Sequence, residues 1–247
     1  MTEQLRQAKQ QNQMQEQRNQ QLYASIAHDL KTPMTMIIGY AKALCQKETK
    51  AKEREDEYLG LIVEQTSHVN SLLDVLLAYA RLQNQSYRLK LEKQDMGEAL
   101  RTCIAGNYHG FEKQDMSLEL EIPENEITFC FDGLEIRRVF TNLIQNMLKH
   151  NPKGTACKIQ LKEKTSKDNQ SHQLQIIFAD NGPKVEKTIC ENMFLPFIVS
   201  DQSRNTKNGS GLGLSISKMA VERLGGIIYY EDNWEEDYKA FVIEFRK

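Results

Sequence analysis

A histidine and an aspartate stand side by side in SIAHDLKTPMTMIIGY, residues 25–40, just ahead of a Lys-Thr-Pro. An imidazole nitrogen becomes a competent nucleophile when a neighbouring carboxylate holds the proton of the other ring nitrogen. Helical spacing places Thr32 one turn after His28, so a hydroxyl joins the imidazole and the Asp29 carboxylate on one polar face. These residues predict a nucleophilic centre, although on an arbitrary helix such a histidine is usually only a surface residue.

The second half of the chain carries residues suited to a phosphorylated partner. Asn142 and Asn146 lie one helical turn apart in NLIQNMLKHNP, and Lys149 and His150 follow about one turn later. Such a face can hold a hydrated metal ion and phosphates. The chain lacks the G-x-x-x-x-G-K-[ST] signature, so this is not the phosphate site of a P-loop enzyme.

Two glycine-bearing segments extend this pattern. In FADNG, Asp180 can accept a hydrogen bond from an exocyclic amine, while Gly182 leaves the backbone room for a flat ring. NGSGLGLSISKMA is a glycine stretch that opens into a helix, whose free N–H groups and dipole favour a bound phosphate. Each segment alone is a weak signal, because glycine stretches are often turns. Their order and spacing together predict a nucleotide site.

An amphipathic helical hairpin is expected to carry the histidine. Apolar residues over 22–44 recur at spacings of three and four, with His28 on the opposite face and Pro33 as an expected kink. A charged connection, KETKAKERED, leads to a second periodic run over 58–80. Because two helices cannot bury both stripes well, a homodimer forming a four-helix bundle is predicted. The first stripe is Ile26, Leu30, Met34, Ile37, Ala41 and Leu44.

Residues 1–21 are rich in glutamine and charge, with few apolar side chains. A helix there is allowed but not self-supporting. A disordered tail and a weak coiled coil that continues into the next helix are both compatible with this composition.

Short alternating runs follow the hairpin and predict a second, α+β part of the chain. Several strands succeed one another with short turns, which favours a mixed or antiparallel sheet with helices on one face. The strands are predicted over 87–93, 117–123, 126–132, 157–164, 172–180, 226–232 and 240–247, and the helices over 97–105, 134–150 and 212–224.

Composition narrows the class of protein. A chain of 247 residues with 40% hydrophobic content can bury a core and divide into one or two domains. The net charge of -2 gives no reason to expect nucleic acid or an acidic membrane surface as a partner. No apolar run reaches the roughly 20 residues of a membrane helix, and five scattered cysteines fit a reducing compartment. A soluble, cytoplasmic chain is therefore expected.

Four motifs resemble those of the sensor histidine kinases of two-component signalling, from about residue 22 to the end. HDLKTP resembles the phospho-acceptor H box, NLIQNMLKHNP the N box, DNGPKV the G1 box, and MFLPF with GSGLGL the F and G2 boxes. The resemblance implies a linker or signalling helix (1–21), a dimerisation and phosphotransfer hairpin (22–84) and a catalytic ATP-binding domain (85–247). That last domain would be of the type shared with gyrase, mismatch-repair ATPases and the large heat-shock chaperone.

The resemblance also implies roles for individual residues. His28 would be phosphorylated, Asp29 would orient or deprotonate it, and Thr32 matches the position that places water for dephosphorylation of a partner. Asn146 would hold Mg²⁺ against the ATP phosphates, and Asp180 would read adenine. The other implied nucleotide-site residues are Asn142, Lys149, His150, Gly182, Phe194, Phe197, Arg204, Lys207, Gly209, Gly211, Leu212, Gly213 and Leu214.

A mobile lid is implied over about 195–210, anchored by Phe194 and Phe197. Within it, Arg204 and Lys207 are either phosphate contacts or part of a solvated basic loop. The phosphoryl group would pass from Mg-ATP to the hairpin histidine when the ATP-binding domain swings onto it. Because the chain carries no receiver domain, the group would then leave for an aspartate of a separate response regulator. The resemblance further implies a membrane-bound sensor upstream of residue 1.

Departures from the family pattern, including His150 in place of the more frequent tyrosine, keep alternatives open, and Lys184 and Thr32 motivate the first of them. Lys184 stands where the G1 box usually has its second glycine. The small hydroxyl residue usual just ahead of the final strand is missing, since the sequence there reads Tyr238-Lys239-Ala240, which predicts weaker adenine binding. One alternative is a weak kinase that acts mainly as a phosphatase of its regulator. The other is an ATP-gated dimerising module that hydrolyses ATP without labelling itself.

Overall fold

The computed structural model describes residues 2–45, 54–84, 86–165, 172–196, 198 and 211–246. The chain divides into two compact units. One comprises Met1–Tyr79 with Val199–Leu212, and the other Ala80–Ile198 with Gly213–Lys247.

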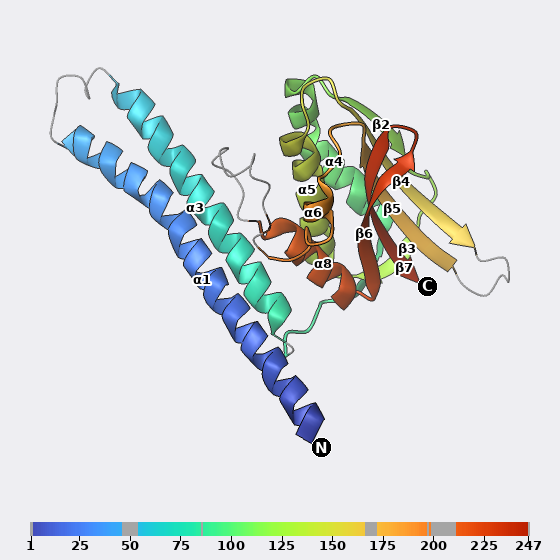
Figure 1. Ribbon diagram of the computed structural model, residues 1–247. Coiled ribbons are helices and arrows are strands. Elements are labelled where there is room, and N and C mark those ends of the chain that lie inside the picture. The colour runs from blue at the N-terminus through green and yellow to red at the C-terminus, as the bar shows by residue number, and fades with distance from the viewer. Residues whose placement is uncertain are drawn as a thin grey trace. The chain divides into compact units, whose positions relative to one another are not determined.

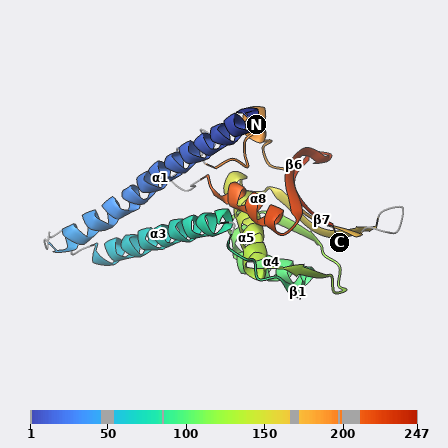
Figure 2. The same ribbon diagram turned by 90° about the horizontal axis from the view of Figure 1, so that it is seen from below.

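The first unit contains an antiparallel pair of long helices, α1 (Thr2–Cys45) and most of α3 (Glu55–Gln83), which lie side by side in both views (Figures 1 and 2). The ring of Tyr40 on α1 stacks on Tyr58 of α3 with centroids 5.3 Å apart. The helical hairpin is confirmed. Since α1 begins at Thr2 and continues through Pro33, the open question on the first 21 residues resolves to helix.

One apolar seam of α3 remains uncovered within this unit. Leu59, Val63, Leu73 and Leu77 are each 40–65% exposed. Their positions fit the alternating spacing of three and four residues that brings side chains onto the seam of a helical bundle. The hairpin therefore leaves an apolar surface of the kind that a further helix pair covers.

The second unit is a mixed five-stranded sheet in the order β2-β4-β5-β7-β6, with α4, α5 and α8 on one face (Figures 1 and 2). Among the described strands only β2 and β4 pair in parallel, so the predicted mixed sheet is confirmed. A separate antiparallel pair joins β1 and β3. The strands are β1 (Glu92–Asp95), β2 (Ser117–Glu121), β3 (Thr128–Phe131), β4 (Ala156–Thr165), β5 (His172–Asp180), β6 (Gly226–Glu235) and β7 (Tyr238–Arg246); the helices are α4 (Met96–Lys113), α5 (Gly133–His150), α6 (Lys187–Cys190) and α8 (Gly213–Arg223).

The strand predicted over 87–93 is wrong for most of its length, because β1 begins only at Glu92. Side chains that are distant in sequence form hydrogen bonds with two backbone groups of the earlier residues. The Lys90 N–H donates to Asp132 Oδ2 at 2.8 Å, and the Tyr87 carbonyl accepts from the Arg223 guanidinium. These two backbone groups are therefore not available for a strand ladder.

Helix α5 is held rigidly over the centre of the sheet. Its N-cap, Asp132, accepts hydrogen bonds from the N–H groups of Leu134 at 3.0 Å and Glu135 at 3.3 Å. Midway along α5, the fully buried Phe140 packs on Phe178 of β5 with ring centroids 5.7 Å apart. This packing fixes where the polar face of α5, with its two asparagines, meets the end of the sheet.

Candidate nucleotide site

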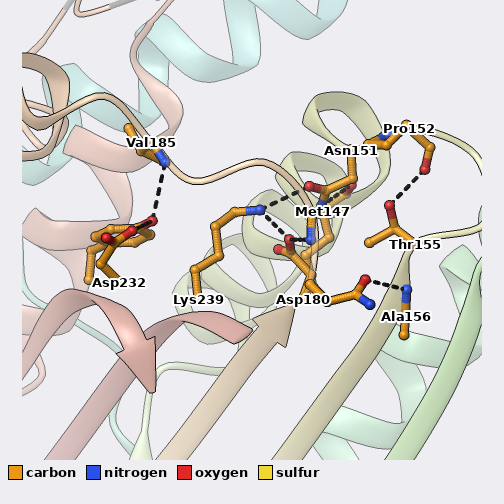
Figure 3. Close-up of polar contacts among 12 residues, drawn as sticks. Met147, Asn151, Pro152, Thr155, Ala156, Asp180, Val185, Asp232 and Lys239 are labelled. Atoms are coloured by element: carbon orange, nitrogen blue, oxygen red, sulfur yellow. Dashed lines mark hydrogen bonds and ion pairs between the residues drawn. The ribbon is translucent and has the colours of Figure 1, made fainter. Parts of the chain in front are cut away.

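A row of three side chains crosses the end of the sheet. Asp180, the last residue of β5, is directly opposite Cys157 on β4 and Lys239 on β7. Directly opposite residues of antiparallel strands project to the same face and lie within contact distance. The Lys239 ammonium forms an ion pair with Asp180 Oδ1, and the two residues are only 7% and 4% exposed (Figure 3). Burial, and to a smaller extent the charge of the same carboxylate, raises the pKa of the Cys157 thiol to about 12.

Asn151 ties this row to the C-terminus of α5. Its amide nitrogen donates to the Met147 carbonyl at 2.9 Å, and its amide oxygen accepts from the Lys239 ammonium at 3.0 Å (Figure 3). Asn151 is itself buried. The buried cation is therefore shared between a strand end and a helix end, and the helix cannot shift without breaking a bond to it.

Position 182, beside Asp180 and Asn151, has room only for glycine. The Gly182 N–H donates to Asp180 Oδ1 at 3.0 Å, which closes a tight turn after β5. A Cβ atom at this position would lie 1.9 Å from Asn151 Oδ1, well inside van der Waals contact. The absence of a side chain lets the loop pack directly against the asparagine.

The N-box helix and the G2-box helix also meet through predicted residues. Asn142 on α5 donates to the Ser217 hydroxyl on α8 at 2.9 Å, and a Cβ on Gly213 would lie 2.1 Å from Asn142 Oδ1. One turn further along α5, Asn146 is half-buried, and no side chain in the described ranges hydrogen-bonds to it. Asn142 thus joins the two helices, whereas Asn146 keeps its amide for another partner.

The last turn of α5 carries two basic residues whose charge is disfavoured. Lys149 and His150 are both exposed, but neighbouring protein atoms partly desolvate their charged groups. Desolvation lowers the pKa of the Lys149 ammonium. For His150, desolvation and then the positive charges of Lys149 and Lys239 lower the pKa of the imidazole below its ordinary value. His150 is therefore mostly neutral near pH 7.

Phe194, at the predicted start of the lid, packs between two elements. Its ring meets Phe241 of β7 edge-on, with centroids 6.2 Å apart, and the Lys218 ammonium of α8 lies 5.7 Å from the ring centre. The preceding loop is attached to β6, because Lys184 hydrogen-bonds to Asn233 and the Val185 N–H donates to the Tyr230 hydroxyl at 3.4 Å.

The remaining predicted residues are only partly placed. Asp29 and the exposed Thr32 lie on α1, in a different compact unit from Asp180. Gly211 has a φ of 62°, and Leu212 is buried ahead of α8, of which Gly213 and Leu214 are the first residues. Outside the described residues lie Phe197, Arg204, Lys207, Gly209 and the side chain of His28.

Sequence reasoning does not assign three residues of this site. Lys239 lies in the Tyr238-Lys239-Ala240 segment that departs from the family pattern, but the sequence alone does not pair it with Asp180. Asn151, at the end of the N-box segment, and Ser217, within its helix, give no signal of their own. Knowledge of the register of β5 against β7 would identify the pair of Asp180 and Lys239, since antiparallel pairing sets these two residues directly opposite each other.

These residues fit a purine nucleotide with a metal ion bound mainly through phosphates. Both hydrogen bonds that Asp180 accepts within the described ranges end on Oδ1, so Oδ2 is left for a ligand. The described residues hold no cluster of three His, Cys, Asp or Glu side chains. This is compatible with Mg²⁺, which is commonly held by one or two protein ligands plus substrate phosphates.

None of the described helices is long and apolar enough to cross a membrane.

The two parts of the chain match two family models. Residues 18–85 match the His Kinase A (phospho-acceptor) domain, and residues 131–247 match the histidine kinase-, DNA gyrase B-, and HSP90-like ATPase. The sensor protein GtcS of Aneurinibacillus migulanus is 30% identical over 203 residues, which are 82% of this chain and 53% of GtcS. The chain thus spans about half the length of that relative.

Solved structures show the same fold. The histidine kinase AdeS of Acinetobacter baumannii aligns with a TM-score of 0.68 and 20% identity, covering 88% of this chain and 96% of AdeS. The histidine kinase ThkA, solved in complex with the response regulator protein TrrA, aligns with a TM-score of 0.67 and 20% identity, covering 96% of this chain and 66% of that one. With a phospho-acceptor domain followed by this ATPase domain, the chain belongs to the sensor histidine kinases of two-component systems, a family of ATP-dependent protein-histidine kinases.

Proposed function

We propose that this chain uses Mg-ATP to phosphorylate His28 and passes the phosphoryl group to an aspartate of a separate response regulator. The observation that supports this most is the Asp180 carboxylate at the end of β5, held by Gly182 and Lys239 with Oδ2 left for a ligand. It occurs in the ATPase match of a chain whose phospho-acceptor match contains His28.

In this proposal each part of the site has a distinct task. Asp180 Oδ2 accepts a hydrogen bond from the exocyclic amine of adenine, and the neutral His150 packs near the base without adding charge. The N-terminus of α8, which opens at Gly213, directs backbone N–H groups toward phosphate. Bound Mg²⁺, held by Asn146 together with the phosphates, would supply neutralisation of their negative charge.

The transfer itself is a displacement at the γ-phosphorus. A neutral nitrogen of His28 forms the N–P bond while the bond from the γ-phosphorus to the oxygen that leaves with ADP breaks. Asp29 accepts or orients the proton on the other ring nitrogen. In the second transfer the N–P bond breaks as an aspartate oxygen of the regulator bonds to phosphorus. Because His28 and Asp180 belong to different compact units, the units must approach for the first step.

The proposed partners follow from the hairpin. A second copy of the chain would cover the exposed seam of Leu59, Val63, Leu73 and Leu77 and complete a four-helix bundle. A response regulator receiver domain is the acceptor, as in the ThkA complex with TrrA. We further propose that the chain is the cytoplasmic part of a membrane sensor, in keeping with the sensor proteins among its relatives.

The test is incubation of the purified chain with Mg²⁺ and γ-labelled ATP. Label on the wild type should be acid-labile and base-stable, which is the signature of phosphohistidine, and it should be absent from His28→Ala. The matched control is His68→Ala, which removes the half-buried histidine of α3 and should retain the label. A wild type that binds ATP without acquiring label would contradict the proposal and favour an ATP-gated module.

The second candidate function is that of a weak kinase that acts mainly as a phosphatase of its response regulator. Thr32 is exposed one turn after His28, where a hydroxyl can position water, and Lys184 fastens the G1-box loop to β6 through Asn233. Loss of phosphate from a phosphorylated receiver domain should then be fast with the wild type and slow with Thr32→Ala. Unchanged dephosphorylation in Thr32→Ala would remove this candidate.

A further inference from the structure

The ends of β5 and β7 present unused hydrogen-bonding capacity side by side. Asp180 accepts its two hydrogen bonds from the described residues at Oδ1, which leaves Oδ2 as an acceptor. The Lys239 ammonium has three N–H donors. Among the described residues only Asp180 Oδ1 and Asn151 Oδ1 accept hydrogen bonds from this ammonium, so one of its N–H donors remains. An acceptor and a donor therefore adjoin each other where the nucleotide base is expected.

The charge of Lys239 changes what this edge can recognise. A lone carboxylate attracts an exocyclic amine and repels a carbonyl oxygen, because two acceptors then face each other without a proton between them. Lys239 is 7% exposed and Asp180 is 4% exposed, so the cation acts on the carboxylate with little solvent screening. A small hydroxyl residue in its place would leave the carboxylate uncompensated.

We propose that Lys239 reads the purine base together with Asp180, so that the site accepts 6-oxo purine nucleotides of the guanine and hypoxanthine type as well as adenine nucleotides. This rests on the proposed function, in which the same site binds the nucleotide. Adenine presents an amine donor beside the N1 acceptor, whereas a 6-oxo purine presents a carbonyl acceptor beside an N1–H donor. With adenine the carboxylate faces the amine and the ammonium faces N1. A 6-oxo purine matches the same pair when the base is displaced or turned over, so that its carbonyl faces the ammonium and its N1–H faces the carboxylate.

The experiment is calorimetric titration with ADP, GDP and IDP in Mg²⁺, which reports binding without phosphoryl transfer. For the wild type, the Kd values of GDP and IDP should lie within about tenfold of that of ADP. Lys239→Thr should raise the ratio of the GDP Kd to the ADP Kd by at least about tenfold, the effect of losing a charge-assisted hydrogen bond. Lys239→Arg, which keeps cationic donors, should hold the wild-type ratio.

Lys158→Thr is the matched control. Lys158 is the neighbouring lysine of β4, ion-paired with Glu119 and Glu235, and as the residue after Cys157 it projects to the opposite face of the sheet. Its loss should leave the ratio unchanged. Circular dichroism checks that each variant is folded, and if Lys239→Thr is not, the wild-type ratio and Lys239→Arg decide.

The possible failures can be told apart. If the wild type binds ADP but rejects GDP and IDP by more than about a hundredfold, or if Lys239→Thr leaves the ratio unchanged, the base-reading role is overturned while the proposed kinase function stands. If none of the three nucleotides binds, the proposed function fails and the base-reading role falls with it.

Discussion

The guanidinium of Arg223, the last residue of α8, donates to the backbone carbonyl of Leu82 in the last turn of α3 at 3.1 Å. The same group reaches the carbonyl of Asn84 at 3.2 Å, bonds to that of Tyr87, and lies 5.5 Å from the centre of the Tyr87 ring. Carbonyls at the end of a helix have no partner within the helix, so a cation with several donors caps them effectively. Leu82, Asn84 and Tyr87 are thereby bound to the end of α8, within the unit that contains the nucleotide site.

Loss of this guanidinium should loosen the end of α3. Arg223→Ala removes charge-assisted hydrogen bonds and should lower the free energy of unfolding of this unit by about 1–3 kcal/mol. Amide hydrogen exchange should accelerate in residues 80–87. Glu222→Ala is the control on the same helix, since its exposed ion pair with Lys218 at 3.8 Å contributes little. Equal exchange rates in the two variants would show that Arg223 does not hold this segment.

A side chain at position 182 should damage the base site. Gly182→Ala places a Cβ 1.9 Å from Asn151 Oδ1, and Asn151 is itself held by Lys239 and Met147. The strain should cost about 1–3 kcal/mol in chemical denaturation and should weaken ADP binding in titration calorimetry.

Gly106→Ala is the control with the opposite expected sign. Gly106 lies inside α4, and beyond the backbone of that helix no atom comes within 4 Å of the place where a methyl carbon would sit. Alanine should therefore stabilise the fold by about 0.5–1 kcal/mol. A neutral Gly182→Ala would show that the loop after β5 yields to the methyl group.

Local patterns were sufficient to predict the fold class, because alternation and helical periodicity are properties of short segments. They failed for residues 87–91, where the Lys90 N–H binds Asp132, 42 residues away, and the Tyr87 carbonyl binds Arg223, 136 residues away. The same limit applied to the site. Asp180 was predicted from its own motif, whereas its pairing with Lys239, 59 residues along the chain, depends on the register of two strands.

The imidazole of His150 should make this unit less stable in mild acid. Desolvation by neighbouring atoms and the charges of Lys149 and Lys239 lower its pKa, so the unfolded chain takes up a proton at a higher pH than the folded chain does. The contribution is fully present above the ordinary pKa of about 6.5 and is lost as pH falls through the lowered folded value. The melting temperature should therefore decrease when the pH is lowered from 7.5 to 5.5, and this decrease should be smaller in His150→Gln.

The charges near His150 provide a direct check of the cause. In an NMR titration, Lys149→Gln should raise the pKa of His150 toward its ordinary value, because a repelling charge is removed. A pKa of His150 at or above the ordinary value in the wild type would contradict the expected sign.

The uncovered seam of α3 should hold two copies of the chain together. Leu73 is 40% exposed and Val63 is 65% exposed although the hairpin is formed, and burial of such side chains against a second hairpin is favourable. The wild type should sediment as a dimer, and Leu73→Glu should raise the dimer Kd by at least about tenfold, because a carboxylate would be buried without a partner. Glu64→Gln, at an exposed polar position of the same helix, should leave the dimer intact. A wild type that stays monomeric at high concentration would mean that another surface covers this seam.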